Sequence, residues 1–377
     1  MSKVKIQGNA SGTGVLTVTA PNTSTDRTIT LPDSTGTILD NTSTLDATKL
    51  TGNLPAISGA SLTNLPSDVQ VSATAPSSPS QGDLWFNSAS STVSNISSKA
   101  MAVYNGTGWN QMSNLFSATG GTVTSYSGYK SHTFTSSGTF VAEVAGTVDI
   151  MIVAGGGGGG GRWHGGGGGA GGVRVLTSQS IAAGNHTVTI GAGGGDVAAQ
   201  NVVGSDGNNS SFASLSATGG GGGGAYNLSG RPGGSGGGDN GGDDSVNDSA
   251  GSGNAGGYSP VEGYAGAETA GSGAYVAGGG GGGAGSTGGN SNKISDGGDG
   301  INNSYKTGSN VGYGGGGCGS NGYQTTGQSG TPAATHGGGA MSNTGDANTG
   351  GGGGAGSGGG SAGKSGGSGI VVIRYAV

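Results

Sequence analysis

The chain has 377 residues, of which 96 are glycine and 9 are proline, and its formal net charge at pH 7 is −6. Apolar residues make up 30% and charged residues 8%, which is too little of either for an ordinary globular core or a charge-solvated disordered chain. The acidic balance, without a basic cluster, argues against a nucleic-acid partner and against binding to an anionic membrane surface.

The apolar stretches and the cysteine content exclude further classes of protein. Residues Met1 to Ile6 lack the apolar run of a secretion signal, and no segment approaches the roughly 20 apolar residues of a membrane span. These features predict a chain that is made in the cytoplasm and does not insert into a membrane. Cys318 is the single cysteine, so it cannot form a disulfide within the chain, and we expect it to be a packed side chain.

Residues 1–40 contain short alternating segments such as Val15–Thr19, which predict a few strands in a small sheet. A sheet of this size is marginal alone, so we expect it to need partner chains. Residues 41–73 contain a near-repeat, in which Ala60–Pro66 echoes Lys49–Pro55, and each unit offers too few leucines for a core. The pattern favours a stalk of several chains wrapped around one another, and a flexible linker is the alternative.

Residues 74–115 are predicted to form a small β unit. Gly82–Asn87 and Met101–Trp109 are its predicted strands, and the second contains an Asn-Gly turn that leads the chain back toward Trp109. Two of the three tryptophans lie here, and we expect them to pack in the core of the unit rather than to form a sugar-stacking platform.

Residues 116–377 are predicted to form one glycine-rich domain that is framed by strands. Two apolar runs, Val148–Val153 and Gly369–Tyr375, border the glycine block and are predicted neighbours in one sheet. We expect Val173–Leu176 and His186–Ile190 to extend that sheet. Two more strands are predicted before the block, at Tyr129–Phe134 and Thr139–Ala142.

The glycine runs themselves, such as Gly155–Gly161, have a flexible linker as their default structure, because glycine loses more backbone entropy on ordering than any other residue. The framing strands favour an ordered alternative. A polyproline-type helix has three residues per turn and no internal hydrogen bonds, so helices without Cβ atoms can lie side by side and bond to one another. We predict a sandwich of such helices, with alanines such as Ala284 and Ala355 facing outward.

The segments between the runs are rich in tyrosine, serine, glycine and asparagine, which is the composition of recognition loops. Inert connecting loops are the alternative for each of them. The candidate binding residues are the aromatic residues and one histidine of these segments, namely Trp163, His164, Tyr226, Tyr258, Tyr264, Tyr275, Tyr305 and Tyr323.

Motifs that resemble catalytic or ligand sites lack the structural context that such sites need. Gly358–Ser365 matches a phosphate-binding loop, but no predicted strand precedes it and no helix follows. Two acidic segments, at Asp239–Asp244 and Asp296–Gly300, offer calcium ligands without EF-hand spacing, so solvated carboxylates are favoured. The four histidines show no zinc spacing and no acid–base pair stands out, so we predict no metal site, no cofactor and no enzyme activity.

The whole layout resembles a bacteriophage tail-fibre protein. The segment from Leu31 to Leu39, the Leu-Thr-Gly-Asn-Leu-Pro repeat and the unit from Gly-Asp-Leu-Trp-Phe-Asn to Tyr-Asn-Gly-Thr-Gly-Trp are similar to phage-fibre modules. The C-terminal part is similar to glycine-rich domains that open as Thr133–Phe140 does and close as Gly369–Tyr375 does. The resemblance implies a mainly β homotrimer with extensive irregular structure, made of a virion-attachment module, a fibrous stalk, a small β unit and a polyglycine II sandwich.

The resemblance also implies a function in the virion. The N-terminus would attach to a phage tail, neck or baseplate protein, and loops of the glycine-rich head would recognise a protein or polysaccharide on the bacterial surface. One alternative is a purely structural fibre or decoration protein whose receptor binding is done by another chain. Another is a depolymerase of surface polysaccharide, which needs two convergent carboxylates.

Overall fold

The computed structural model describes residues 69–112, 116–161, 164–198, 201–241, 248–269, 277–289, 295–321, 333–357 and 361–377. The attachment module and the leucine repeat predicted within residues 1–68 lie outside these residues. All regular elements of the described part are β-strands, which confirms the mainly β class. The described part also has no helix with the length and apolar character required to cross a bilayer.

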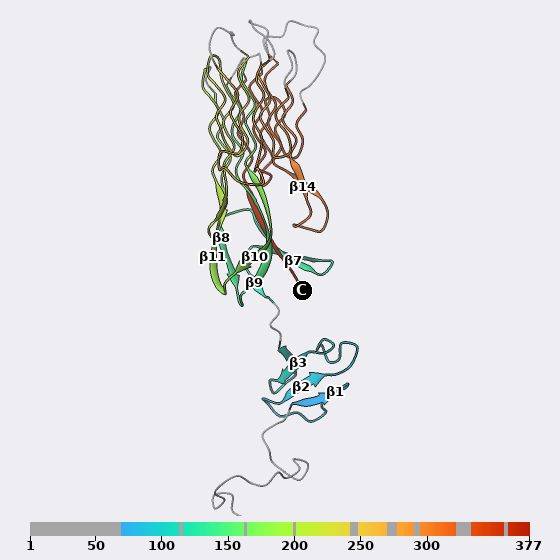
Figure 1. Cartoon of the computed structure of the whole chain (residues 1–377). Coiled ribbons are helices and arrows are strands. Elements are labelled where there is room, and N and C mark those ends of the chain that lie inside the picture. The colour runs from blue at the N-terminus through green and yellow to red at the C-terminus, as the bar shows by residue number, and fades with distance from the viewer. Residues whose placement is uncertain are drawn as a thin grey trace, which may run out of the picture. The chain divides into compact units, whose positions relative to one another are not determined.

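Residues 69–112 form a four-stranded sheet of order β1–β2–β3–β4 (Figure 1). Its strands are β1 (Gln70–Ser72), β2 (Leu84–Asn87), β3 (Met101–Tyr104) and β4 (Trp109–Met112). Trp85 is fully buried and its ring meets that of Trp109 edge-on at 5.4 Å, so the prediction of a tryptophan core is confirmed. The predicted Asn-Gly turn is also confirmed, because Gly106 joins β3 to β4 with a φ of +99°, which glycine tolerates.

Residues 116–377, which we call the head, contain two five-stranded sheets and a separate hairpin (Figure 1). The first sheet has the order β10 (Val173–Ile181), β9 (Gly146–Val153), β16 (Ile370–Ala376), β7 (Tyr129–Phe134) and β6 (Thr122–Tyr126). The second has the order β13 (Leu215–Ala217), β12 (Ser210–Phe212), β11 (Gly184–Thr189), β8 (Gly138–Ala142) and β5 (Ala118–Thr119). The hairpin consists of β14 (Ile301–Asn303) and β15 (Val311–Tyr313).

The two apolar runs that border the glycine block are neighbours in the first sheet, as predicted. Strands β9 and β16 pair antiparallel, with Ile150 opposite Ile373. Strand β10 lies on the other side of β9, so the placement of Val173–Leu176 is confirmed. The placement of His186–Ile190 in the same sheet is wrong, because β11 pairs with β8 in the second sheet.

Burial explains why β11 belongs to the second sheet. The first sheet has an apolar face, which must be covered by another layer. Val188 of β11 and Phe140 of β8 are fully buried in one cluster with Ile150 and Ile373 of the first sheet. The two sheets therefore share one hydrophobic core, which lies next to the point where β9 leads into the glycine block.

The glycine runs lie side by side and bond to one another through their backbones, and we call this array the glycine lattice (Figure 1). Every third N–H group of the run Gly155–Gly161 donates to the same neighbouring segment. The donor–acceptor pairs are Gly156–Gly367 and Gly159–Lys364 for the first neighbour, Gly157–Gly169 and Gly160–Gly166 for the second, and Gly155–Asn208, Gly158–Ser205 and Gly161–Val202 for the third. This repeat of three is the one expected for side-by-side polyproline-type helices.

The run Gly165–Gly172 is enclosed by the lattice on every side. It donates to three neighbouring segments and accepts from three others. The outgoing bonds include Gly166 to Gly224, Gly167 to Gly279 and Gly168 to Gly353, and the incoming bonds include Gly157 to Gly169, Gly238 to Gly167 and Gly317 to Gly168. A Cβ atom at Gly168 would lie 2.2 Å from the carbonyl oxygen of Gly157, so there is no room for a side chain at this position.

The alanines of the lattice do not face outward as predicted. Ala284 and Ala355 are both buried. The methyl group of Ala284 packs in an apolar cluster with Val173 and Tyr313, where the lattice meets the strands. Ala284 therefore stands where a small side chain has apolar partners.

Candidate binding surface

One end of the lattice lies away from the strands (Figure 1). The run Gly155–Gly161 follows β9 directly, and seven residues at about 3.1 Å each carry the chain roughly 20 Å from the sheet. Hydrogen bonds between backbone groups hold the residues at this end together. The N–H of Gly161 donates to the carbonyl oxygen of Val202 at 3.1 Å, and the N–H of Gly241 donates to that of His164 at 2.7 Å. We call the described residues at this end the distal rim. They include His164, Val202, Tyr226, Leu228, Asp239, Asn240 and Asp248.

The most exposed aromatic side chain of the rim belongs to a tight turn. The backbone N–H of Ala225 donates a hydrogen bond to the carbonyl oxygen of Leu228 at 3.0 Å, and the N–H of Leu228 donates to the carbonyl oxygen of Ala225 at 2.6 Å. Asn227 has a φ of +56°, a conformation that asparagine adopts more readily than most residues. Tyr226 and Leu228 are each 42% exposed, and so is Val202. The rim thus presents apolar side chains on a fixed backbone.

The ring of His164 lies next to that of Tyr226. The side chain of His164 is buried, and its ring centre lies 6.1 Å from that of Tyr226. Its carbonyl oxygen accepts the bond from Gly241, which joins two segments of the rim. Of the two candidate residues, the structure therefore exposes Tyr226 and uses His164 to position it.

A buried carboxylate lies beneath the turn. Asp239 accepts the N–H of Asn240 at 2.8 Å and the hydroxyl of Thr269 at 3.4 Å. Burial raises the pKa of Asp239 to about 6, and the negative charges of Asp248 and Glu268 act in the same direction. The side-chain oxygen of Asn240 also accepts the N–H of Asn227 at 3.3 Å, which connects the acidic group to the turn.

The described residues of the two acidic segments considered for calcium fix the backbone and side chains of neighbouring segments. Within the described ranges, no group of three or more His, Cys, Asp or Glu residues could hold a metal ion. Asp296 accepts the N–H of Ala333 at 2.6 Å, and Asp299 accepts the hydroxyl of Thr335 at 2.7 Å, so each fixes a neighbouring segment. Asp243 and Asp244 lie outside the described residues.

The remaining candidates lie away from the rim or outside the described residues. Tyr264 is exposed, and its backbone belongs to the lattice through bonds to Gly283 and Gly236 at 3.0 Å each. Tyr258 is half-buried and bonds to Ser216 through its hydroxyl at 2.9 Å. Three predicted contact residues fall outside the described ranges, namely Trp163, Tyr275 and Tyr323.

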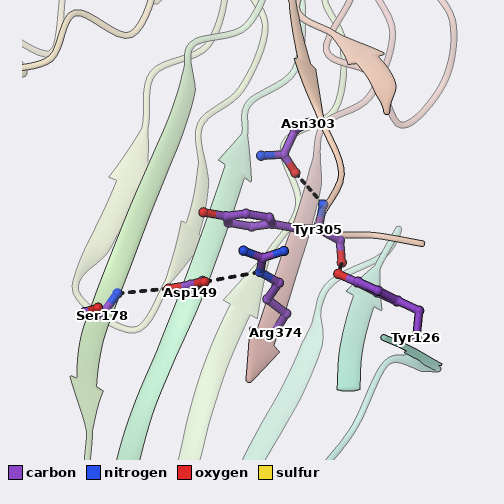
Figure 2. A network of polar contacts seen from close by, with 6 residues as sticks. All are labelled: Tyr126, Asp149, Ser178, Asn303, Tyr305 and Arg374. Atoms are coloured by element: carbon purple, nitrogen blue, oxygen red, sulfur yellow. Dashed lines mark hydrogen bonds and ion pairs between the residues drawn. The ribbon is translucent and has the colours of Figure 1, made fainter. Parts of the chain in front are cut away.

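Tyr305 belongs to a polar network at the strand end of the head, which Figure 2 shows. It is only 8% exposed, and the guanidinium carbon of Arg374 lies 3.8 Å from the centre of its ring. Its N–H donates to Asn303 at 2.8 Å, and its carbonyl oxygen accepts the hydroxyl of Tyr126. This arrangement ties the segment between β14 and β15 to the first sheet. Tyr305 is therefore a buried structural residue and not part of the distal rim.

Val202 and Leu228 were not among the predicted contact residues. Their only signal in the sequence is that each is an apolar residue in a polar segment between glycine runs.

Comparison with known proteins places the head in a family. No curated protein matches the chain. The family described as a glycine-rich domain matches residues 134–376, from the last residue of β7 to the last residue of β16. The match covers both framing strands and the whole lattice, and it spans more than half of the chain. The chain therefore belongs to the glycine-rich domain family.

Proposed function

We propose that the chain is a bacteriophage tail-fibre protein whose head recognises a molecule of the bacterial surface through its distal rim. The single observation that carries this proposal is the exposure of Tyr226, Leu228 and Val202 at the end of the lattice opposite the framing strands. In the proposal, residues 1–40 attach the fibre to the virion and the rim faces outward. The chain acts by binding and carries out no reaction.

The construction of the lattice supports a recognition role. Main-chain bonds hold the runs together, so the segments that connect them need not contribute side chains to the core. The identity of rim residues can then vary without loss of the lattice, as loops vary on other rigid scaffolds. Tyrosine suits such a surface, because it offers a large contact area with few rotatable bonds.

Charge narrows the kind of receptor that fits. The described rim carries the acidic residues Asp239, Asp248 and Glu268, and no described lysine or arginine forms an ion pair with them. A polyanionic surface would be repelled by such a rim. The proposal therefore favours a receptor patch that is neutral or basic and has an apolar or ring-shaped group for Tyr226.

Adsorption of particles to host cells tests the receptor role. We expect the double substitution Tyr226→Ser with Leu228→Ser to slow adsorption at least tenfold, with an unchanged melting temperature of the purified chain. The matched control is Val123→Ser, which removes a side chain of similar exposure from β6 in the framing sheet. Equal adsorption by the double variant and the control would contradict the proposal. It would favour the alternative of a structural fibre whose receptor is bound by another chain.

Self-association is the second part of the proposal, and a row of apolar residues supports it. Val71, Phe86, Met101 and Met112 stand opposite one another across all four strands of the small sheet. Paired residues point to the same face of a sheet, and Trp85 and Ala102 occupy the other, buried face. Val71 is 67% and Met112 53% exposed, so the row is uncovered at both edges.

A second and a third copy of the chain are the proposed cover of this row. The row carries no charge, and Asp83 and Lys99 are the only charged residues of residues 69–112. The net charge of the small unit is therefore zero, so two copies of the unit do not repel each other although the whole chain is acidic. Soluble oligomers are most often assemblies of identical chains. We therefore propose that the chain is a homotrimer in which this face takes part in the contact.

A further inference from the structure

Strand β10 is an edge of the first sheet, and some of its backbone groups point outward. Where the ladder between β9 and β10 begins, the N–H of Ala154 donates to the carbonyl oxygen of Gly172 at 3.0 Å. Bonded and non-bonded pairs alternate along an antiparallel ladder, so the N–H and C=O groups of Val173 and Val175 point away from β9. The N–H of Val173 accordingly donates to the carbonyl oxygen of Glu262, on the outer side of the strand, at 2.8 Å.

The outward backbone groups of Val175 have no hydrogen-bond partner among the described residues. The edge is closed on both sides of this position. Glu262 takes the N–H of Val173, and the carbonyl oxygen of Thr177 accepts the side-chain amide of Gln179 at 2.7 Å. One N–H donor and one C=O acceptor thus remain open at a single residue of the edge.

A recess opens beside Val175, between β10 and residues 259–261, and we call it the lateral recess. Its volume is about 180 Å³, and its lining includes the four consecutive residues Val173–Leu176. Arg174 and Leu176 stand opposite residues of β9 that belong to the other face of the sheet, so they line the recess through their backbone. The open backbone groups of Val175 therefore border the lateral recess.

The side chains that line the lateral recess are mainly apolar. Val175 stands opposite Met151, so its side chain lies on the face of the sheet where Met151 packs with Ala284 and Ile301. Val175 is 36% and Val261 47% exposed, so the recess is open to solvent. An apolar cavity of about 150 Å³ holds a benzene-sized ring, so the recess has room for one side chain of the size of leucine. Its apolar lining consists of Val173, Val175, Pro260, Val261, Ala284 and Ile301.

We propose that the open edge of β10 and the lateral recess together bind an extended segment of another protein through one apolar residue. The N–H and C=O groups of that residue pair with the C=O and N–H groups of Val175, as in the addition of a strand to a sheet. Residues that pair across a sheet point to the same face, so the side chain of the bound residue enters the recess toward Val261 and Ile301.

The chemistry of the site favours a peptide over a free hydrocarbon and over a second copy of the chain. A hydrocarbon would cover the backbone groups of Val175 without bonding to them, which costs free energy. A contact through one residue buries much less surface than a stable oligomer needs, so it fits a short segment of a partner. This site belongs to the framing sheet and not to the distal rim, so it does not depend on the receptor role proposed above.

The experiment measures binding of labelled peptides to the full chain by fluorescence anisotropy. The probe is acetyl-Thr-Thr-Leu-Thr-Thr-amide, because threonine is uncharged and favours an extended backbone. Two further peptides carry glycine or N-methylleucine in place of the leucine. Glycine removes the side chain that enters the recess, and the N-methyl group removes the donor that pairs with Val175. We expect the leucine peptide to bind in a saturable manner and each of the other two to bind at least tenfold more weakly.

Two variants of the chain locate the binding. Val261→Asp places a charge on the apolar wall at an exposed position and should weaken binding of the leucine peptide at least tenfold, with an unchanged melting temperature. Val123→Asp is the matched control, because Val123 is 48% exposed on β6, the opposite edge of the same sheet, and binding should be unchanged. The proposal is overturned if the leucine peptide does not bind saturably, if the glycine or the N-methylated peptide binds equally well, or if the two variants bind alike. A lower mass of Val261→Asp in sedimentation equilibrium would assign the recess to a second copy and would also overturn it.

Discussion

The Nε atom of Arg374 lies 3.1 Å from Oδ2 of Asp149 and donates a hydrogen bond to it (Figure 2). Asp149 belongs to β9, which leads into the glycine lattice, and Arg374 belongs to β16, which leaves it. The two residues stand opposite each other in the sheet. One ion pair thus joins the two strands at which the lattice begins and ends.

Replacement of Arg374 by methionine should lower the free energy of unfolding by about 2 kcal/mol, since a partly buried ion pair and the stacking on Tyr305 are both lost. The two side chains are 17% and 21% exposed, so solvent screens them little. Urea denaturation measures the change. Arg231→Met is the matched control, because its ion pair with Asp206 is about half exposed and should cost less than about 1 kcal/mol. Equal losses for the two variants would show that the position of Arg374 is of no special importance.

Substitution of Gly168 by alanine should destabilise the head by at least ~3 kcal/mol or prevent its folding. The added Cβ would lie 2.2 Å from the carbonyl oxygen of Gly157 and 2.7 Å from its carbon, and neither backbone atom can move without breaking neighbouring bonds. Gly195→Ala is the matched control, because a Cβ there meets nothing within 4 Å. Thermal melts of the purified chains measure the difference. A stable Gly168→Ala variant would refute the enclosed position of this run.

Replacement of Asp239 by asparagine should raise stability at neutral pH. Burial raises the pKa of this carboxyl from 3.8 to about 6, so its ionised form is disfavoured in the folded chain. The loss of folding free energy that results is fully present above about pH 6, and it disappears as the pH falls toward about 4, the pKa of the same carboxyl in the unfolded chain. We expect a gain on the order of 2 kcal/mol at pH 7.5 and none at pH 4. Melting temperatures across this range measure it, with the exposed Asp206→Asn as control.

The comparison must be made between variant and original chain at each pH, because another group titrates with the opposite sign. His132 is buried between Gly120 and Tyr375, and burial lowers the pKa of its ring. The unfolded chain therefore binds a proton at His132 more readily than the folded chain does, and the free energy of unfolding decreases as the pH falls below the ordinary pKa of 6.5. A constant gain of the Asp239→Asn variant at all pH values would contradict the assignment to Asp239.

Replacement of Met112 by glutamate should weaken the proposed self-association. The charge would stand at the open edge of the apolar row, where an identical row from another copy would have to desolvate it. Sedimentation equilibrium of the full chain should show at least a tenfold increase in the dissociation constant. Gln70→Glu is the control, because Gln70 pairs with Trp85 and so points to the other face. A monomeric original chain, or an equal effect of the control, would refute this contact.

The framing of the lattice could be predicted from the sequence because its signals are local. Continuous apolar runs such as Ile370–Ile373 need burial on both faces, and this requirement alone places them in the middle of a sheet. The period of three in the lattice could also be predicted, because extended glycine has few other ways to satisfy its backbone groups. These predictions depend on chemistry that repeats along the chain.

The candidate site could be predicted only in part, because it depends on contacts between distant residues. Tyr226 and Tyr305 both belong to short segments between glycine runs, yet one is exposed and the other lies on Arg374. Arg174 and Tyr258 are likewise far apart in the chain, yet the guanidinium of the one stacks on the ring of the other. For the same reason the sheet of β11 was predicted wrongly, since its partner depends on what Val188 packs against.

A core that is made of peptide groups should respond to temperature differently from one made of hydrocarbon. Unfolding of an ordinary domain raises the heat capacity by about 12–15 cal/mol/K per residue, because apolar exposure increases it more than polar exposure reduces it. The glycine lattice exposes mainly amide surface when it comes apart, so its increment per residue should be well below that range. The stability curve of the head should then be unusually flat, so the head would stay folded in the cold as well as in warm surroundings.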